Sequence, residues 1–164
     1  MSFKILTVCT GNICRSPSAE VILRARLAEA GLAAVEVDSA GTADYHIGEP
    51  PSDPAQRLAS RRGYDLSALR ARQVSASDFD DFDLILAMDR GHMSRLTRMQ
   101  PPGSRGRLHL FLEVMPQAGP DLPDPYYGGD GDYELMLDLI EAAVPAWIAR
   151  LQEDLPGPAR TQGA

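Results

Sequence analysis

The sequence predicts a single-domain α/β fold, a three-layer α/β/α sandwich around a four-stranded parallel sheet with a flavodoxin-like or Rossmann-like strand order. Short apolar, β-prone segments alternate along the chain with segments whose apolar residues recur at helical spacing. The chain has 164 residues, 44% of them hydrophobic, which is enough for one substantial core. Ligands of such sheets bind beyond the carboxyl ends of the strands, so we expect a site in the loop after the first strand.

Four segments are expected to form the strands of this sheet. They run from Phe3 to Val8, from Val35 to Ser39, from Asp83 to Met88 and from Leu108 to Leu112. The third is mostly apolar, which is typical of a fully buried strand. The acidic run before it, residues 78–83, contains two phenylalanines and is interpreted as a solvated turn rather than a calcium site.

Four helices are expected between and after the strands. They cover Ser18 to Ala30, Ala55 to Arg62, Arg90 to Met99 and Asp132 to Glu153. A long loop rich in glycine and proline, Gly41 to Pro54, precedes the second helix. Pro145 is expected to kink the last one. Helical spacing assigns an inward face to Ala19, Ile22, Leu23 and Leu27 in the first helix and to Leu135, Leu139, Ala142 and Ala146 in the last.

Composition limits the function classes. We expect one domain over residues 1–154 and a flexible tail over 155–164, which holds two prolines and two glycines. The net charge of −7, without a basic block, argues against nucleic-acid binding. No stretch approaches the roughly 18 apolar residues needed to cross a bilayer, so we expect a cytoplasmic protein without membrane contact.

The loop after the first strand carries the most informative residues. Cys9 and Arg15 lie six positions apart, between the apolar strand and the first helix. Backbone N–H groups at such a junction point inward, and the helix dipole favours an anion there. We therefore expect Cys9 to ionise easily and Arg15 to bind two phosphate oxygens at once. The pair alone is a weak signal, because a strand-end cysteine is more often a small buried hydrophobe.

The residues around this pair favour the phosphate interpretation. Gly11 and Asn12 tolerate the left-handed backbone conformations that a tight loop around a phosphate requires. Ser16 is placed to donate a hydrogen bond to the sulfur of Cys9, and Pro17 suits the first turn of a helix.

A candidate acid lies far downstream, in the segment from Leu122 to Gly129. Prolines on both sides stiffen the backbone around Asp124, and two tyrosines follow. Protonation of the leaving oxygen speeds its departure from phosphorus, which is one role for Asp124. The alternative is an ordinary surface loop whose aspartate caps the next helix.

Together these motifs resemble the low-molecular-weight protein tyrosine phosphatases. The resemblance rests on Val8 to Pro17, Asp38 to Thr42, Ala71 to Val74, Phe82 to Asp89 and Asp124 to Gly128, which occur in the family's order. It covers roughly residues 3 to 150. Some members carry a histidine before the Ala-Arg-Gln stretch, where this chain has Leu69 and Arg70.

The resemblance implies a role for each matching residue. Cys9 is the nucleophile, Arg15 binds phosphate and the transition state, and Asp124 acts as general acid and then general base. The phosphate-binding loop comprises Thr10, Gly11, Asn12, Ile13, Cys14 and Ser16. Asn12, Ser16 and Ser39 form its supporting network, and Tyr45, Tyr126 and Tyr127 line an aromatic slot.

The resemblance further implies hydrolysis of phosphotyrosine in proteins through a cysteinyl-phosphate intermediate, with inorganic phosphate and other oxyanions as competitive ligands. No cofactor is expected. No metal is expected either, because His46, His92 and His109 lack ligand-like spacing and are interpreted as ordinary surface or boundary residues. The arginine-rich, almost lysine-free composition suggests a bacterial source, and we expect a monomer or weak dimer.

Three alternatives to this function are considered. Arsenate reductases of the same fold need further cysteines, whereas this chain has two. Protein arginine phosphatases carry a threonine where this chain has Ile13, and they lack the paired tyrosines. A phosphate-binding module without catalysis would not need Cys9, Arg15 and Asp124 together.

The second cysteine, Cys14, has two possible roles. It could trap an oxidised Cys9 as a reversible disulfide, or it could simply pack under the loop. The sequence leaves both open.

Overall fold

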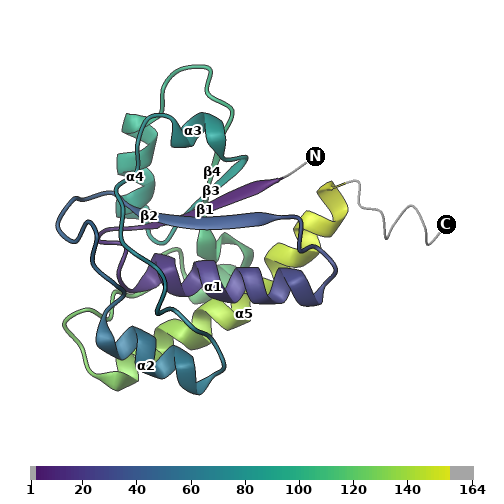
Figure 1. Ribbon diagram of the computed structural model, residues 1–164. Helices are drawn as coiled ribbons and strands as arrows, with labels where there is room; N and C mark the ends of the chain where they lie inside the picture. The colour runs from purple at the N-terminus through teal and green to yellow at the C-terminus, as the bar shows by residue number, and fades with distance from the viewer. Residues whose placement is uncertain (1–2, 156–164) are drawn as a thin grey trace.

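The computed structural model describes residues 3–155 and contains one parallel sheet of four strands (Figure 1). The strands are β1 (Lys4–Cys9), β2 (Glu36–Gly41), β3 (Leu84–Ala87) and β4 (Arg107–Leu110), in the order β2-β1-β3-β4. This order places a topological switch point between β1 and β3, as in flavodoxin-like folds. The predicted fold class is confirmed.

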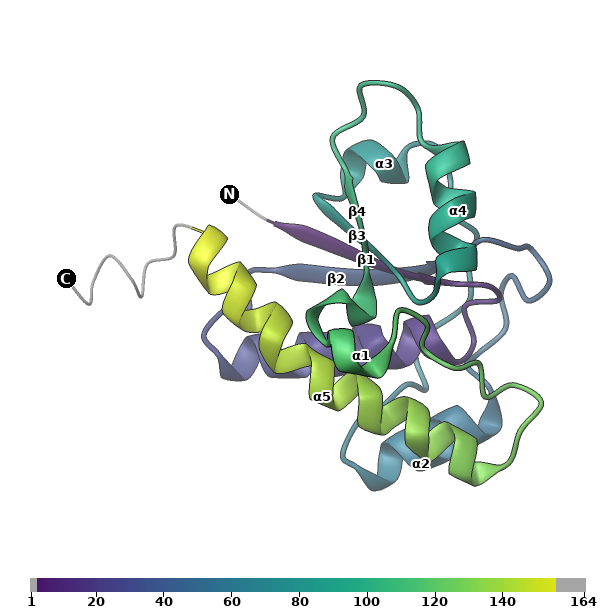
Figure 2. The same ribbon diagram turned by 180° about the vertical axis from the view of Figure 1, so that it is seen from behind.

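Helices cover both faces of the sheet. They are α1 (Arg15–Glu29), α2 (Asp53–Arg61), α3 (Asp78–Asp81), α4 (Arg90–Met99) and α5 (Asp130–Asp154). Two short 3₁₀ turns, η1 (Phe111–Val114) and η2 (Pro116–Ala118), follow β4. Figures 1 and 2 show α1, α2 and α5 on one side of the sheet and α3 and α4 on the other.

Each face of the sheet is covered by its own apolar cluster. The larger cluster joins β1 to α1, α2 and α5 and includes Trp147, which is 1% exposed. The smaller cluster contains Ile85 of β3, Phe79 of α3 and Leu96 of α4, all fully buried. The alternating strand and helix pattern therefore buries both faces, which explains why all four residues of β3 are buried.

The first helix agrees with the predicted inward face, since Ala19, Ile22, Leu23 and Leu27 are all fully buried. It begins at Arg15 rather than Ser18, so the phosphate loop leads directly into its first turn. The fourth strand ends at Leu110 rather than Leu112. The side chain of Glu113 accepts a hydrogen bond from the Leu110 N–H at 3.1 Å and starts the 3₁₀ turn η1 there.

The predicted inward face of α5 is wrong. Leu135 and Ala142 are exposed, and Leu139 and Ala146 are only partly buried. The buried face is instead Tyr133, Met136, Leu137, Ile140, Ala143, Val144, Trp147, Ile148 and Leu151. Both stripes are apolar, and the two large aromatic side chains decide which one enters the core. The helix continues through Pro145 without ending.

The acidic run at residues 78–83 is only partly the solvated turn that the sequence predicts. Its first four residues form α3, and Asp78 is 4% exposed. The carboxylate of Asp78 pairs with Arg72 at 3.0 Å and accepts the Ser75 N–H at 2.8 Å, which compensates its burial.

The domain over 1–154 stays a prediction, and the predicted tail lies outside the described residues except for Leu155.

Candidate active site

The site is built where β1 ends and α1 begins. Cys9 is the last residue of the strand and Arg15 the first of the helix, and each is 3% exposed. Asn12 has a φ of 59°, the left-handed conformation expected for this loop. No side chain caps the N-terminus of α1, which leaves its first N–H groups free for an anion.

A chain of hydrogen bonds supports the sulfur of Cys9. Its Sγ lies 3.0 Å from Ser16 Oγ. The side-chain amide of Asn12 donates to Ser16 Oγ at 2.8 Å and to Ser39 Oγ at 2.9 Å. Because Ser16 accepts from Asn12, its own hydrogen is available to the sulfur, with the Ala40 carbonyl at 3.4 Å as the more distant acceptor.

This chain ends on a carboxylate that sequence reasoning missed. Ser39 Oγ donates to Glu20 Oε1 at 2.7 Å, and Glu20 is 3% exposed. The Asn12 carbonyl oxygen accepts the backbone N–H of Arg72 at 3.0 Å, which fixes the orientation of the amide. Glu20 stands one helical turn after Ser16 on α1, and that spacing is the only sequence signal for it.

Arg15 is held by the neighbouring strand. Its Nη1 donates to Asp89 Oδ2 at 2.9 Å and to the Leu122 carbonyl at 2.8 Å. Asp89 follows β3 and also caps α4, since it accepts the His92 N–H at 2.9 Å. The carboxyl ends of adjacent parallel strands thus bring Arg15 and Asp89 together.

Asp124 lies beside Arg15 at the pocket. Its Oδ2 lies 3.5 Å from Arg15 Nη2, and its Oδ1 accepts the Tyr126 N–H at 3.1 Å. It does not cap the next helix, because Asp132 accepts the Gly129 N–H at the start of α5. The side chain is 51% exposed.

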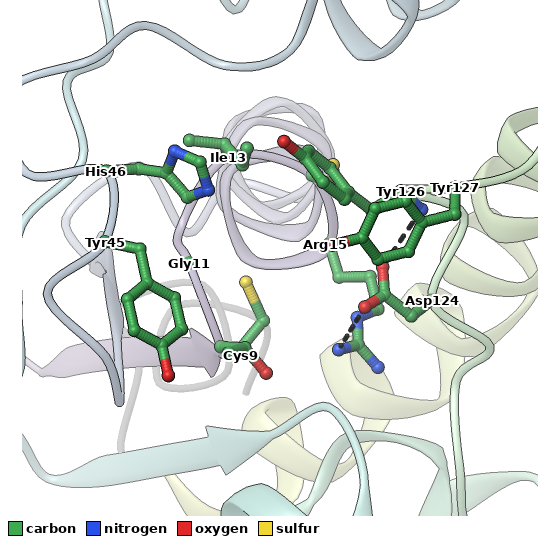
Figure 3. Close-up of a pocket in the computed structure, with 11 residues that line it drawn as sticks. Cys9, Gly11, Ile13, Arg15, Tyr45, His46, Asp124, Tyr126 and Tyr127 are labelled. Carbon is green, nitrogen blue, oxygen red and sulfur yellow. Dashed lines mark hydrogen bonds and ion pairs between the residues drawn. The ribbon is translucent and has the colours of Figure 1, made fainter.

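These residues line one pocket of about 170 Å³ (Figure 3). Cys9 lies on its floor, with Tyr45 and His46 on one side and Tyr126 and Tyr127 on the other. The rings of Tyr126 and Tyr127 meet edge to face at 4.7 Å. The pocket lining is Cys9, Thr10, Gly11, Ile13, Cys14, Arg15, Tyr45, His46, Asp124, Tyr126 and Tyr127.

The structure therefore brings the predicted site residues together, with Asn12, Ser16 and Ser39 directly behind the loop. Their catalytic roles stay predictions. Two histidines differ from the interpretation made from sequence: His46 lines the pocket, and His92 is 3% exposed and contacts the loop. Their contacts come from segments far apart in the chain, which sequence spacing does not reveal.

Cys14 lines the pocket, but its side chain is buried and packed against neighbouring residues. It is 4% exposed, and its Sγ lies 3.4 Å from Ser52 Oγ and 3.5 Å from the Tyr133 hydroxyl. Burial raises the pKa of the Cys14 thiol, and burial likewise raises the pKa of Tyr133 to about 12. These contacts favour the packing interpretation of Cys14, while its redox role stays a prediction.

Within residues 3–155 no group of three or more histidine, cysteine or acidic side chains could hold a metal ion. No helix in the same range is long and apolar enough to span a membrane.

A cysteine, an arginine and a carboxyl group converge around one loop at a helix N-terminus, an arrangement suited to phosphate-ester chemistry. Comparison with known proteins gives the family. The model of the low molecular weight phosphotyrosine protein phosphatases matches residues 4–157. A low molecular weight protein-tyrosine-phosphatase of Streptomyces coelicolor is 42% identical over 162 residues, which cover 96% of this chain and 98% of the relative.

Solved structures are also similar to this chain. A protein tyrosine phosphatase of Entamoeba histolytica has a TM-score of 0.88 at 33% identity and covers 93% of this chain and 98% of its own. Vibrio vulnificus Wzb, in complex with benzylphosphonate, has a TM-score of 0.80 at 34% identity, with coverages of 91% and 99%. A Drosophila arginine phosphatase, DARP, has a TM-score of 0.85 at 30% identity, with coverages of 90% and 97%.

The chain belongs to the low molecular weight protein tyrosine phosphatase family, a family of hydrolases.

Proposed function

We propose that this pocket hydrolyses phosphotyrosine in proteins through a phosphocysteine on Cys9. The observation that carries the proposal is the convergence of Cys9, Arg15 and Asp124 in one pocket with tyrosines on its walls. A phosphate at the loop would meet the free N–H groups at the start of α1, and Arg15 would bind its oxygens. The aromatic walls would pack on the phenyl ring.

In the first step the Cys9 thiolate attacks phosphorus in line, and the bond to the phenolic oxygen breaks. Asp124, protonated in the complex, donates its proton to that oxygen. The phosphate dianion supplies the condition for this protonation, because it takes Arg15 as its partner and brings negative charge close to the carboxyl. Arg15 and the loop amides stabilise the charge on the equatorial oxygens.

In the second step Asp124 deprotonates a water molecule, which attacks the phosphocysteine and releases inorganic phosphate. The Cys9 sulfur leaves as a thiolate, and the Ser16 hydroxyl, 3.0 Å away, would stabilise its charge. Asp124 holds the proton taken from water while phosphate is still bound, and release of phosphate frees the Cys9 thiolate for the next substrate.

Phosphoarginine is the second candidate substrate, because DARP shares the fold. Two features of this pocket favour phosphotyrosine instead. Ile13 presents an apolar side chain in the lining, and Tyr126 with Tyr127 adds aromatic surface. We further propose that the enzyme acts in a bacterial cytoplasm as a monomer or weak dimer, on the basis of its composition and its similarity to the Streptomyces protein.

The test is turnover of matched phosphotyrosine and phosphoarginine peptides. We expect the wild-type protein to release phosphate from the first at a much higher kcat/KM, and Cys9→Ser to release none. Asp124→Ala should lose more rate on phosphotyrosine than on an aryl phosphate whose leaving group needs no proton. Near-normal turnover by Cys9→Ser contradicts the mechanism, and a preference for phosphoarginine contradicts the substrate.

A further inference from the structure

His92 is a buried histidine for which the proposed reaction has no role. It lies in the first turn of α4 and is 3% exposed. Its Nε2 lies 2.8 Å from Thr10 Oγ1 and 3.4 Å from Arg15 Nη2. One nitrogen atom of α4 thus contacts both ends of the phosphate loop on β1 and α1.

The partners fix which ring nitrogen carries the proton. A guanidinium can only donate hydrogen bonds, so the Nε2 atom that faces Arg15 must present its lone pair. The hydroxyl of Thr10 can donate to the same lone pair, so the two donors share one acceptor and Thr10, at 2.8 Å, is the closer. The proton of a neutral ring then lies on Nδ1, which is 3.1 Å from Asp89 Oδ1. That contact is poorly aligned for a hydrogen bond, so its attraction is mainly electrostatic.

The charges around the ring favour its neutral form. Burial comes first among the causes that lower the pKa of His92 to about 4, and the positive charge of Arg15 acts in the same direction. The carboxylate of Asp89 opposes this shift, as do Asp124 and Asp121 from the loop before α5. A charged imidazolium would place an N–H against the guanidinium that it now accepts from.

We propose that His92 is a positioning residue of this site: its neutral ring accepts from Thr10 and Arg15 and holds both in the orientation that binds phosphate. Asp89 and His92 contact different nitrogens of the guanidinium. Asp89 Oδ2 accepts a hydrogen bond from Nη1, and His92 Nε2 lies 3.4 Å from Nη2. The arginine therefore keeps one orientation, in which Nη2 also lies 3.5 Å from Asp124 Oδ2 at the pocket. The purpose of this positioning, phosphate binding for catalysis, rests on the proposed function. The contacts of His92 with Thr10 and Arg15 do not depend on that function.

The first test reads the ring itself. Nitrogen NMR of the wild-type protein, with the His92 signals assigned by their loss in His92→Gln, should show a neutral ring protonated on Nδ1 at pH 7 and at pH 5. A charged ring at pH 7, or a ring protonated on Nε2, overturns the proposal. This measurement needs no turnover, so its failure is distinct from failure of the proposed phosphatase activity.

The second test measures binding of inorganic phosphate by calorimetry, also without turnover. His92→Leu removes the acceptor and should weaken phosphate binding about tenfold, because the guanidinium loses one hydrogen-bond partner. His92→Gln places an amide oxygen near the position of Nε2 and should restore binding to within about threefold. Equal weakening in both variants shows that ring shape rather than the acceptor matters, and it overturns the proposal.

Leu96→Ala is the matched control. Leu96 lies on the same helix and is fully buried in the smaller apolar cluster, away from the pocket lining. Its truncation should lower thermal stability and leave phosphate affinity unchanged. If His92→Leu lowers thermal stability but binds phosphate within twofold of wild type, its role is structural only and the proposal is wrong.

Discussion

At the scale of single residues, the site works by giving each polar group one defined direction. Asn12 donates to two hydroxyls, so Ser16 and Ser39 are both oriented by a single amide. Ser39 then donates to Glu20, and the Ser16 hydrogen is left for the Cys9 sulfur at 3.0 Å, with the Ala40 carbonyl at 3.4 Å as the more distant acceptor. The buried carboxylate thus helps to fix a hydroxyl that it does not touch.

Ser16→Ala should slow breakdown of the phosphocysteine more than its formation. The variant removes the hydrogen bond to the departing sulfur, and we expect kcat to fall by about tenfold or more. Rapid-mixing kinetics with an aryl phosphate should then show a burst of phenol followed by slow turnover. Ser18→Ala is the control, because Ser18 is equally buried but donates to the Cys14 carbonyl. An equal effect of both variants would contradict the role of Ser16.

His92 makes stability depend on pH. Its folded-state pKa of about 4 lies below the ordinary value of 6.5, so between these values the unfolded chain binds a proton that the folded chain does not. The free energy of unfolding therefore rises with pH across this window, by up to about 3 kcal/mol from this residue. Urea unfolding between pH 4.5 and 7 should show a shallower rise for His92→Gln than for wild type. Parallel curves for the two proteins would be inconsistent with a buried neutral ring.

At the scale of elements, the loop depends on how closely two strands approach. Gly41 ends β2 and pairs with Cys9. A Cβ atom on Gly41 would lie 2.5 Å from the Thr10 carbonyl oxygen, which belongs to the backbone of the phosphate loop. The glycine is required here by a close approach of two main chains and not by its own φ angle.

Gly41→Ala should displace the phosphate loop and abolish most activity. Overpacking of this kind typically costs about 1–3 kcal/mol of stability. Gly131→Ala is the matched control, because a Cβ atom at that position on α5 would meet nothing within 4 Å, and alanine favours a helix. Activity assays and thermal unfolding of both variants check this. A fully active Gly41→Ala protein would show that the loop tolerates the shift.

The elements also show what the sequence could predict. The strand, loop and helix around Cys9 are local, and their residue types indicate both the structure and the anion site. Asp89 and His92 escaped prediction because they reach the site from the end of β3 and from α4, through packing that no local spacing reveals. For Glu20 the only sequence signal was its position one helical turn after Ser16. The face of α5 was wrong because two apolar stripes compete on that helix, and only the packed core selects between them.

At the scale of the whole molecule, both faces of one sheet are covered, and the site lies at the carboxyl edge between them. Arg15 belongs to α1 on one face, while Asp89 and His92 begin α4 on the other. The active geometry therefore requires both layers of helices to be in place. We expect folding and site formation to be one event.

Unfolding should accordingly be a single cooperative transition. Trp147, the only tryptophan, is buried in the larger cluster and donates to the Phe111 carbonyl at 2.7 Å. Its fluorescence and the far-ultraviolet circular dichroism should change together in urea. Separate midpoints for the two signals would contradict a single domain over residues 1–154.

The central claim is that Cys9 takes the phosphoryl group. Asp124→Ala should slow hydrolysis of the intermediate, so this variant is mixed with an aryl phosphate, quenched in acid and mapped by mass spectrometry. The account predicts one phosphoryl group on the peptide that contains Cys9, and none when Cys9→Ser is added. A phosphoryl group on another residue, or turnover that persists without the Cys9 sulfur, would contradict it.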